Sequence, residues 1–189
     1  LFSVYDSYPA SYRSEDLILG ELDQTEVEIC DFSAFNMSLK EKSVKALGAQ
    51  NFQGILFKAT FPKELAHWVY VCDKKEAGLR KEGEIALMDN PSFNRYFDVF
   101  TEDQILARYA LSPKLMERFC GLKEKFNCPI SMVLRNREVI IALNLGKNSF
   151  EPSFEKSLLE DNTIRDYISS IKGFTDMVKE LGLNNHIWK

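Results

Sequence analysis

The stretch that decides the expected fold is Ile130-Ser-Met-Val-Leu-Arg-Asn-Arg-Glu-Val-Ile-Ile-Ala-Leu143. Two apolar runs, 130–134 and 139–143, lie on either side of the polar segment 135–138. Short runs rich in β-branched residues and separated by a few polar residues are typical of a β-hairpin. The stretch therefore predicts two antiparallel strands.

The chain before this hairpin also has the patterns of strands. In residues 25–32, Val27 and Ile29 alternate with glutamates, which indicates a strand with one buried face. Residues 1–16 are expected to be an irregular lead-in, and residues 36–50 a loop or a long hairpin tip. Further strands are expected at residues 17–22, 52–61, 67–72, 84–87 and 97–100.

The apolar period changes from two to about 3.6 in the second half of the chain. Thr101-Glu-Asp-Gln104 has the spacing of a capping box, in which Thr101 would begin a short helix and Gln104 would reach back to it. We expect this helix to face the core with Ile105, Leu106 and Tyr109.

Two longer helices are expected after it. Ser112 and Pro113 have the residue types of an N-cap and a first-turn proline. The apolar residues of the helix that they begin are Leu115, Met116, Phe119, Leu122 and Phe126. A broad apolar stripe predicts a long C-terminal helix over residues 163–181, with Gly173 as a mild defect inside it.

These patterns predict an α+β fold: an antiparallel sheet, open or rolled into a partial barrel, with helices packed on one side and a long C-terminal helix. The chain has 189 residues, 45% of them hydrophobic, which is typical of one globular domain over residues 1–189. No stretch approaches the roughly 20 apolar residues of a membrane span. The N-terminus has neither a Met nor the pattern of a signal peptide, which suggests that an upstream segment has been removed.

Charge is distributed unevenly along the chain. Residues 1–31 hold one basic side chain, Arg13, against eight acidic ones, a net charge of −7, which leaves +3 for the rest because the whole chain carries −4. The lack of a basic surplus argues against nucleic acid as a partner. The acidic end could steer a cationic partner by charge, and the alternative is that its acids form the solvent face of two strands.

Motifs that would carry chemistry are missing from the sequence. No glycine-rich nucleotide loop and no G-x-S-x-G motif occur, so we assign no catalytic residue and no cofactor. The four cysteines form no C-x-x-C pair, so no metal site is expected and the thiols are expected to be reduced. A Cys–His nucleophile would need His67 or His186 beside a cysteine.

Basic residues at turns provide the candidate binding residues. Arg135 and Arg137 flank the tip of the central hairpin, and other basic residues crowd the expected loop 73–83. Each basic side chain near an anionic leaflet contributes about 1 kcal/mol to membrane binding. The alternative is that charged turns keep a sheet soluble and discourage edge pairing.

Several runs of sequence resemble one bacterial family, known only as a domain of unknown function, number three-one-three-seven. The longest is Phe97-Asp-Val-Phe-Thr-Glu-Asp-Gln-Ile-Leu-Ala-Arg-Tyr-Ala-Leu-Ser-Pro-Lys-Leu-Met-Glu-Arg118. The others are Tyr12-Arg-Ser-Glu-Asp-Leu-Ile-Leu-Gly20, Asn148-Ser-Phe-Glu-Pro152 and Ile187-Trp188. The resemblance spans nearly the whole chain, although residues 36–50 and 73–83 do not match.

This resemblance implies a setting and no activity. Members of the family commonly carry hydrophobic, membrane-anchoring segments ahead of this domain. The chain would then be the soluble part of a longer membrane-anchored protein, on the cytoplasmic side of the bacterial inner membrane. The matched residues that exceed the needs of packing are expected to form a buried ion-pair network; they are Arg13, Asp103, Arg108 and Arg118.

We therefore expect a non-enzymatic cytosolic interaction domain of a membrane-anchored bacterial protein, with an unknown protein partner or an anionic membrane surface as its target. One alternative is a hydrolase or transferase with an unrecognised site, which would use Cys or His with a nearby acid. A pocket that holds His67 or His186 beside such a group would favour it. Another alternative is a lipid-binding or small-ligand-binding domain.

Overall fold

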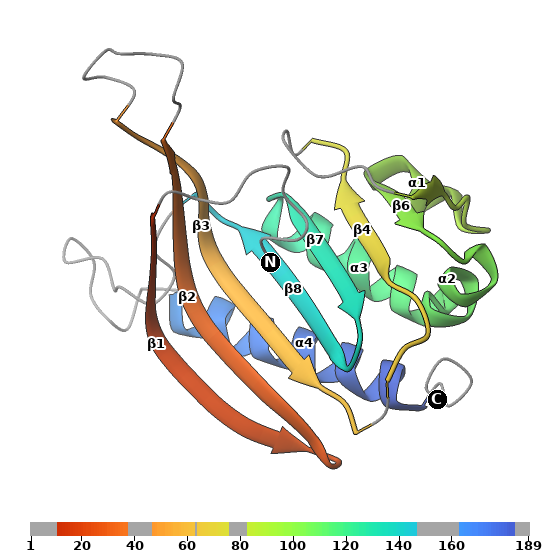
Figure 1. Ribbon diagram of the computed structural model, residues 1–189. Coiled ribbons are helices and arrows are strands. Elements are labelled where there is room, and N and C mark those ends of the chain that lie inside the picture. The colour runs from red at the N-terminus through yellow and green to blue at the C-terminus, as the bar shows by residue number, and fades with distance from the viewer. Residues whose placement is uncertain (1–10, 38–46, 63, 76–82, 147–162, 184–189) are drawn as a thin grey trace.

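The computed structural model describes residues 11–37, 47–62, 64–75, 83–146 and 163–183 (Figure 1). There, eight antiparallel strands form one sheet in the order β1-β2-β3-β8-β7-β4-β6-β5. The strands are β1 (Ser11–Leu22), β2 (Thr25–Met37), β3 (Leu47–Thr60), β4 (Val69–Asp73), β5 (Glu84–Ile85), β6 (Phe97–Thr101), β7 (Ile130–Arg135) and β8 (Glu138–Asn144). The helices are α1 (Pro91–Tyr96), α2 (Gln104–Ala110), α3 (Pro113–Phe126) and α4 (Thr163–Leu183).

The α+β class and the antiparallel sheet expected from the sequence are confirmed. Among the described strands, β1 pairs only with β2 and β5 only with β6, so the sheet has two open edges. The long strands β1, β2 and β3 curve (Figure 1), but a barrel would require the two edge strands to pair with each other. The sheet is therefore open and not rolled into a barrel.

One face of the sheet packs against the helices. Pairing between neighbouring strands forms a row across this face that consists of Ile29, Phe57, Ile141, Met132, Val71 and Val99. Each of these side chains is at most 4% exposed and belongs to one core with residues of all four helices. The ring of Phe57 stacks on that of Phe174 in α4 at 4.9 Å between centroids. Because a slip of one residue would turn a whole row outward, this packing fixes the register.

The opposite face changes in character from one end of the sheet to the other. At the end formed by β7, β4 and β6, a buried apolar cluster contains Tyr70, Cys72, Phe100 and Val133. Towards β2, the ammonium group of Lys58 lies 3.0 Å from Glu28 and 3.2 Å from Glu138. A second apolar layer therefore covers one end of this face. At the other end, the charged ladder lies beside a further buried apolar cluster, which contains Phe32, Ala34, Phe52 and Ala142.

The helix α2 begins at a different cap from the one expected. Asp103, not Thr101, is the N-cap, and its carboxylate accepts from the backbone N–H groups of Ile105 and Leu106. Thr101 is fully buried, and its hydroxyl donates to the backbone oxygen of Trp68 at 2.9 Å. Both side chains suit a cap, but Thr101 is still paired within the sheet, so the helix starts later.

The prediction of which residues of α2 face the core is correct only in part. Leu106 is buried as expected, together with Ala107 and Ala110. Ile105 and Tyr109 are instead 67% and 55% exposed. The later start and the two small alanines let α2 lie close to the sheet with the larger residues outward.

The helix α3 and the central hairpin are confirmed. The hydroxyl of Ser112 accepts from the backbone N–H of Leu115 at 3.2 Å, and Pro113 lies in the first turn of α3. In the hairpin, Leu134 of β7 pairs with Val139 of β8. In the described part of the chain, no helix combines the length and the apolar character needed to cross a membrane.

Several strand boundaries differ from the expected ones. Strand β1 begins at Ser11, so the described part of the supposed lead-in, residues 11–16, is a strand. Strand β2 continues to Met37, and strand β3 already begins at Leu47, so both take up parts of the expected loop 36–50. Residues 38–46 of that loop lie outside the described residues. Asp73, placed in a charged loop, is the last residue of β4. Alternating patterns fade at strand ends, where pairing still continues through the backbone.

A buried ion pair joins the sheet to the helix layer. Lys123 of α3 pairs with Asp73, and both side chains are at most 5% exposed. Lys123 also donates to the backbone oxygen of Cys128 at 2.8 Å, and Asp73 accepts from the backbone N–H of Ile130 at 3.1 Å. The pair therefore joins the ends of β4 and α3 to the start of β7.

Candidate functional site

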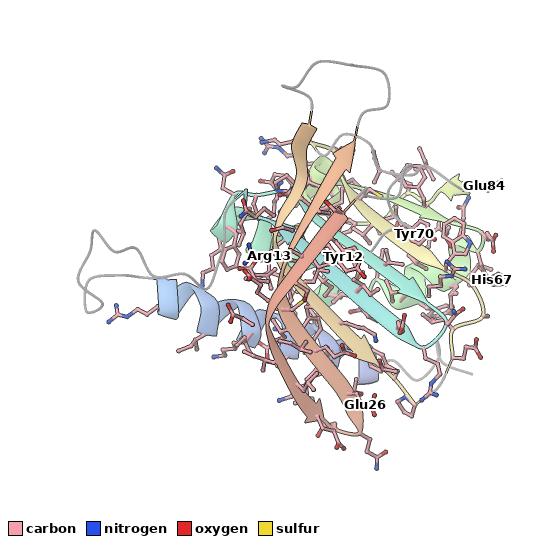
Figure 2. The ribbon with its side chains drawn as sticks, turned by 60° about the vertical axis from the view of Figure 1, so that its left-hand side comes forward. Tyr12, Arg13, Glu26, His67, Tyr70 and Glu84 are labelled. Atoms are coloured by element: carbon pink, nitrogen blue, oxygen red, sulfur yellow. The ribbon has the colours of Figure 1, made fainter. Side chains whose placement is uncertain are left out.

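The outer strand β1 exposes three consecutive apolar side chains on an open sheet edge. Leu17 is 57% exposed, Ile18 42% and Leu19 68%. Single exposed apolar residues are common on proteins, but a run of three on an edge strand is not. Figure 2 views the molecule from the side of β1, with Tyr12 and Arg13 labelled on this strand.

Local backbone geometry positions this run. The pairing of β1 with β2 is regular on both sides of an irregularity between Glu15 and Ile18, and Asp16 there has φ of 50°. A bulge of this kind bends an edge strand and interrupts its pairing. At the far end of β1, Asp23 and Gln24 both have positive φ, which suits the tight hairpin turn that joins β1 to β2. The segment Ile18–Leu22 is thus a regular strand between a bulge and a turn.

Acidic side chains surround this segment. Leu19 lies opposite Glu28, and Glu21 lies opposite Glu26 on the neighbouring strand. Lys58 pairs with Glu28, and this hydrogen bond raises the pKa of Lys58 against the opposing effect of burial. Charge near the open edge is therefore mainly negative, as the uneven charge of the sequence suggested.

The structure gives the two candidate arginines different environments. Arg137 donates from Nε to the backbone oxygen of Phe61 at 2.9 Å, and its own backbone oxygen accepts from Phe61 at 2.8 Å. Arg137 therefore joins the hairpin tip to the residue after β3. Arg135 is exposed at the end of β7, where it pairs in register with Glu138. Both residues are exposed, and their role in binding anionic lipid remains a prediction.

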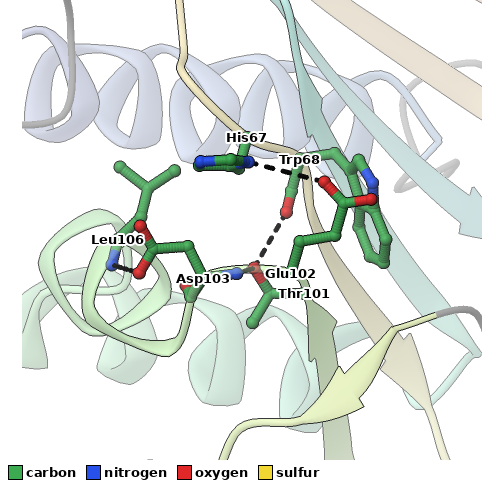
Figure 3. A network of polar contacts seen from close by, with 6 residues as sticks. All are labelled: His67, Trp68, Thr101, Glu102, Asp103 and Leu106. Carbon is green, nitrogen blue, oxygen red and sulfur yellow. Dashed lines mark hydrogen bonds and ion pairs between the residues drawn. The ribbon is translucent and has the colours of Figure 1, made fainter.

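His67 has a carboxylate partner on the surface. Its Nδ1 lies 3.4 Å from Glu102, and the two side chains are 45% and 54% exposed (Figure 3). The hypothesis of an enzyme called for a pocket that holds the histidine beside a Cys or a carboxylate. This pair lies on open surface, beside the contact of Thr101 with Trp68 and the cap of α2 at Asp103 (Figure 3). His186, the other histidine considered, lies outside the described residues.

The thiols of Cys30 and Cys120 are poorly suited to nucleophilic attack. Burial raises the pKa of the thiols of Cys30 and Cys120. A raised pKa leaves less of the reactive thiolate at neutral pH. In the part of the chain that the structure describes, no group of three or more His, Cys, Asp or Glu side chains is arranged to hold a metal ion.

The expected buried network of four charged residues is wrong. Arg13 pairs with Glu15 at 2.5 Å on the surface, and Asp103 caps α2. Arg108 is exposed, while Arg118 pairs with Asp176 of α4 at 2.9 Å. These residues lie on separate elements, and the buried pair is formed by Asp73 and Lys123 instead.

Sequence reasoning missed the exposure of β1 because strand order decides it. The run Leu17-Ile-Leu19 has the same residue types as a buried strand. Its position as the first strand of a hairpin was a usable signal, since a first strand can pair on one side only unless a later strand adds to it. The acidic residues around it were a second signal.

Comparison with known proteins gives one family and one solved structure. Residues 50–183 match the family model described as "Protein of unknown function (DUF3137)". No curated protein matches the sequence. The chain is similar to the crystal structure of the mycobacterial trehalose monomycolate transport factor A, TtfA, at 14% sequence identity and a TM-score of 0.44, over 87% of this chain and 72% of that one.

Proposed function

This chain belongs to the DUF3137 family of proteins of unknown function, and we propose that it is a non-enzymatic interaction domain whose docking surface is the open edge of β1. The observation that carries the proposal is the exposed run Leu17-Ile-Leu19 on that edge. We further propose the setting that the family resemblance implies, the cytoplasmic side of a bacterial inner membrane.

The mode of binding that suits this surface is addition of a strand. An edge strand presents backbone N–H and C=O groups that can pair with an extended segment of another protein. Main-chain hydrogen bonds then provide affinity, and alternate side chains provide specificity. The bulge at Asp16 separates the regular segment Ile18–Leu22 from the regular segment Ser11–Glu15, so a strand added beside Leu19 would be about five residues long.

Charge complementarity indicates the chemistry of the partner. Glu21, Glu26 and Glu28 lie beside the apolar residues of this segment. A partner strand with an apolar residue opposite Leu19 and a Lys or Arg two positions along would place both side chains on the face of Leu19 and Glu21, where the basic one meets the opposite charge of Glu21. The same acidic residues disfavour an anionic membrane at this edge and disfavour a second copy of the same strand.

A selection experiment tests the proposal. Random nine-residue peptides displayed on phage would be selected on the purified chain, and enriched peptides would be titrated by fluorescence polarisation. We expect the enriched peptides to carry an apolar and a basic residue two positions apart, and we expect N-methylation of alternate backbone amides to abolish binding because it removes the donors of the added strand.

Two matched variants complete this test. Leu19→Lys should weaken peptide binding about tenfold or more, since it replaces an apolar contact by a repelling charge. Ile105→Lys changes an equally exposed apolar residue on α2 and should leave binding unchanged. The proposal fails if no peptide is enriched, if N-methylated peptides bind equally well, or if both variants behave alike.

A further inference from the structure

A groove of about 240 Å³ lies between α3 and α4, and none of its lining residues belongs to β1. Its polar lining includes Arg118 and Lys125 from α3, and Ser169, Lys172 and Asp176 from α4. None of these residues takes part in the proposed docking of a strand. The groove is therefore a separate feature, and its chemistry can be considered independently.

Contacts across the groove show how the two helices lie. Arg118 contacts Asp176 near one end, and Lys125 donates to the hydroxyl of Ser169 near the other. The order of these contacts along the two helices shows that α3 and α4 run antiparallel. Between them, a Cβ atom added to Gly173 would lie 2.9 Å from Leu122. Gly173 therefore allows the helices to approach closely, which brings the charged side chains of both to one groove.

The lining of the groove is positively charged. Three of its side chains are cationic and one, Asp176, is anionic. Asp176 already accepts from Nη1 of Arg118 at 2.9 Å, so its charge is compensated locally. The positive surplus in the groove contrasts with the net charge of −4 on the whole chain. An anion would be attracted to this place rather than to the surface in general.

Some hydrogen-bond donors of the groove have no acceptor among the described residues. Nε of Arg118 is buried and has no hydrogen-bond partner among the described residues. A buried donor without an acceptor is costly, and a guanidinium group has the geometry to donate to two oxygens of an oxyanion. Ser169 accepts from Lys125, so its own hydroxyl hydrogen can still donate.

We propose that the groove between α3 and α4 binds a phosphate-type oxyanion, held by Arg118, Lys125 and Lys172. Arginine and lysine together recognise phosphate by directed hydrogen bonds and by charge. The phosphate can be free in solution or belong to the headgroup of an anionic lipid. The two sources share the same chemistry at the groove and differ in the experiment that detects them.

Two binding measurements distinguish the sources. Inorganic phosphate would be titrated into the chain by calorimetry, at an ionic strength held constant with chloride. Co-sedimentation would be measured with phosphatidylcholine vesicles that contain phosphatidic acid, and with vesicles of phosphatidylcholine alone. Saturable binding of inorganic phosphate would identify a free anion as the ligand. Binding to the vesicles with phosphatidic acid, without binding of inorganic phosphate or of neutral vesicles, would identify a lipid headgroup.

Charge reversal on α4 provides a matched pair of variants. Lys172→Glu reverses a charge that lines the groove, and Lys179→Glu makes the same change on an exposed lysine of α4 outside the groove. We expect Lys172→Glu to weaken binding about tenfold or more and Lys179→Glu to change it by less than about twofold. Arg118→Lys keeps the charge but removes the Nε donor, and it should also weaken binding.

The outcomes decide the proposal. It is supported if binding to either source depends on Lys172 and Arg118 but not on Lys179. It is overturned if neither phosphate nor acidic vesicles bind, or if the two charge reversals weaken binding equally, because the attraction would then come from the general surface. Peptide binding at β1 should be the same in all three variants, so failure here does not affect the proposed function.

Discussion

The inner strands β4 and β6 and the edge strand β1 are built from similar residues but have opposite relations to solvent. In β4 and β6, Val69, Val71 and Val99 are at most 1% exposed, and apolar clusters lie on both faces. In β1, Leu17 and Leu19 are more than half exposed, although leucine is at least as apolar as valine. The difference teaches that position in the sheet, and not residue type, decides whether an apolar side chain is buried. The inner strands β4 and β6 form the structural end of the comparison, and β1 forms the exposed one.

The largest expected effect comes from breaking the buried pair at the structural end. Lys123→Met leaves the buried carboxylate of Asp73 without its partner and should lower the free energy of unfolding by about 3–5 kcal/mol. Urea denaturation followed by circular dichroism measures this change. The control Lys125→Met, on an exposed lysine of the same helix, should cost less than about 0.5 kcal/mol. Equal losses in the two variants would show that the pair does not hold the sheet to α3.

An intermediate effect distinguishes the two residues that could begin α2. Asp103→Ala removes the acceptor for two backbone N–H groups and should cost about 1 kcal/mol in the same denaturation experiment. Gln104→Ala removes only an exposed contact to Glu84 and should cost less than about 0.5 kcal/mol. A larger loss of unfolding free energy for Gln104→Ala than for Asp103→Ala would support the capping box expected from the sequence.

The smallest effect concerns the charged ladder towards β1, and it depends on pH. The hydrogen bond to Glu28 raises the pKa of Lys58 in the folded state, with burial opposing it. Folding is therefore favoured while Lys58 is charged, below its unfolded pKa of about 10.4, and this contribution is lost as pH rises through the higher folded value. Because the pair is partly exposed, Lys58→Met should cost only about 0.2–1 kcal/mol at pH 8.

The control for this prediction is the pH dependence itself. Thermal unfolding of the wild type and of Lys58→Met should differ by the same amount from pH 7 to pH 9. The difference should shrink as pH rises above about 10.4. A difference that stays constant into the more alkaline range would mean that Lys58 acts by packing of its aliphatic chain and not by its charge.

Local patterns predicted those elements that local interactions decide. The hairpin of β7 and β8 and the helix α3 follow from alternation, helical spacing and the cap at Ser112. The cap of α2 could not be chosen from sequence because Thr101 and Asp103 both suit it, and only the pairing of β6 excludes Thr101. The Asp73–Lys123 pair was also hidden, since the two residues are 50 positions apart.

The candidate site was less predictable than the fold. The acidic bias around β1 was visible in the sequence, but the exposure of Leu19 depends on strand order. The groove depends on an antiparallel contact between α3 and α4, where Gly173 looked like a mild defect of the helix. Arg135 and Arg137 attracted attention because turns concentrate charge, yet Arg137 contacts the backbone near β3.

The pairing of β3 with β8 has a consequence for synthesis of the chain on the ribosome. Gly54 pairs with Asn144, so the middle of the sheet joins residues from opposite thirds of the polypeptide. Before β8 has emerged from the ribosome, a nascent chain can pair β1, β2 and β3 with one another. The edge of β3 that later pairs with β8 then stays unpaired. Such late, long-range contacts slow folding and prolong the exposure of an unpaired strand edge that is prone to aggregation. Early folding intermediates of this protein would thus be candidates for chaperone binding.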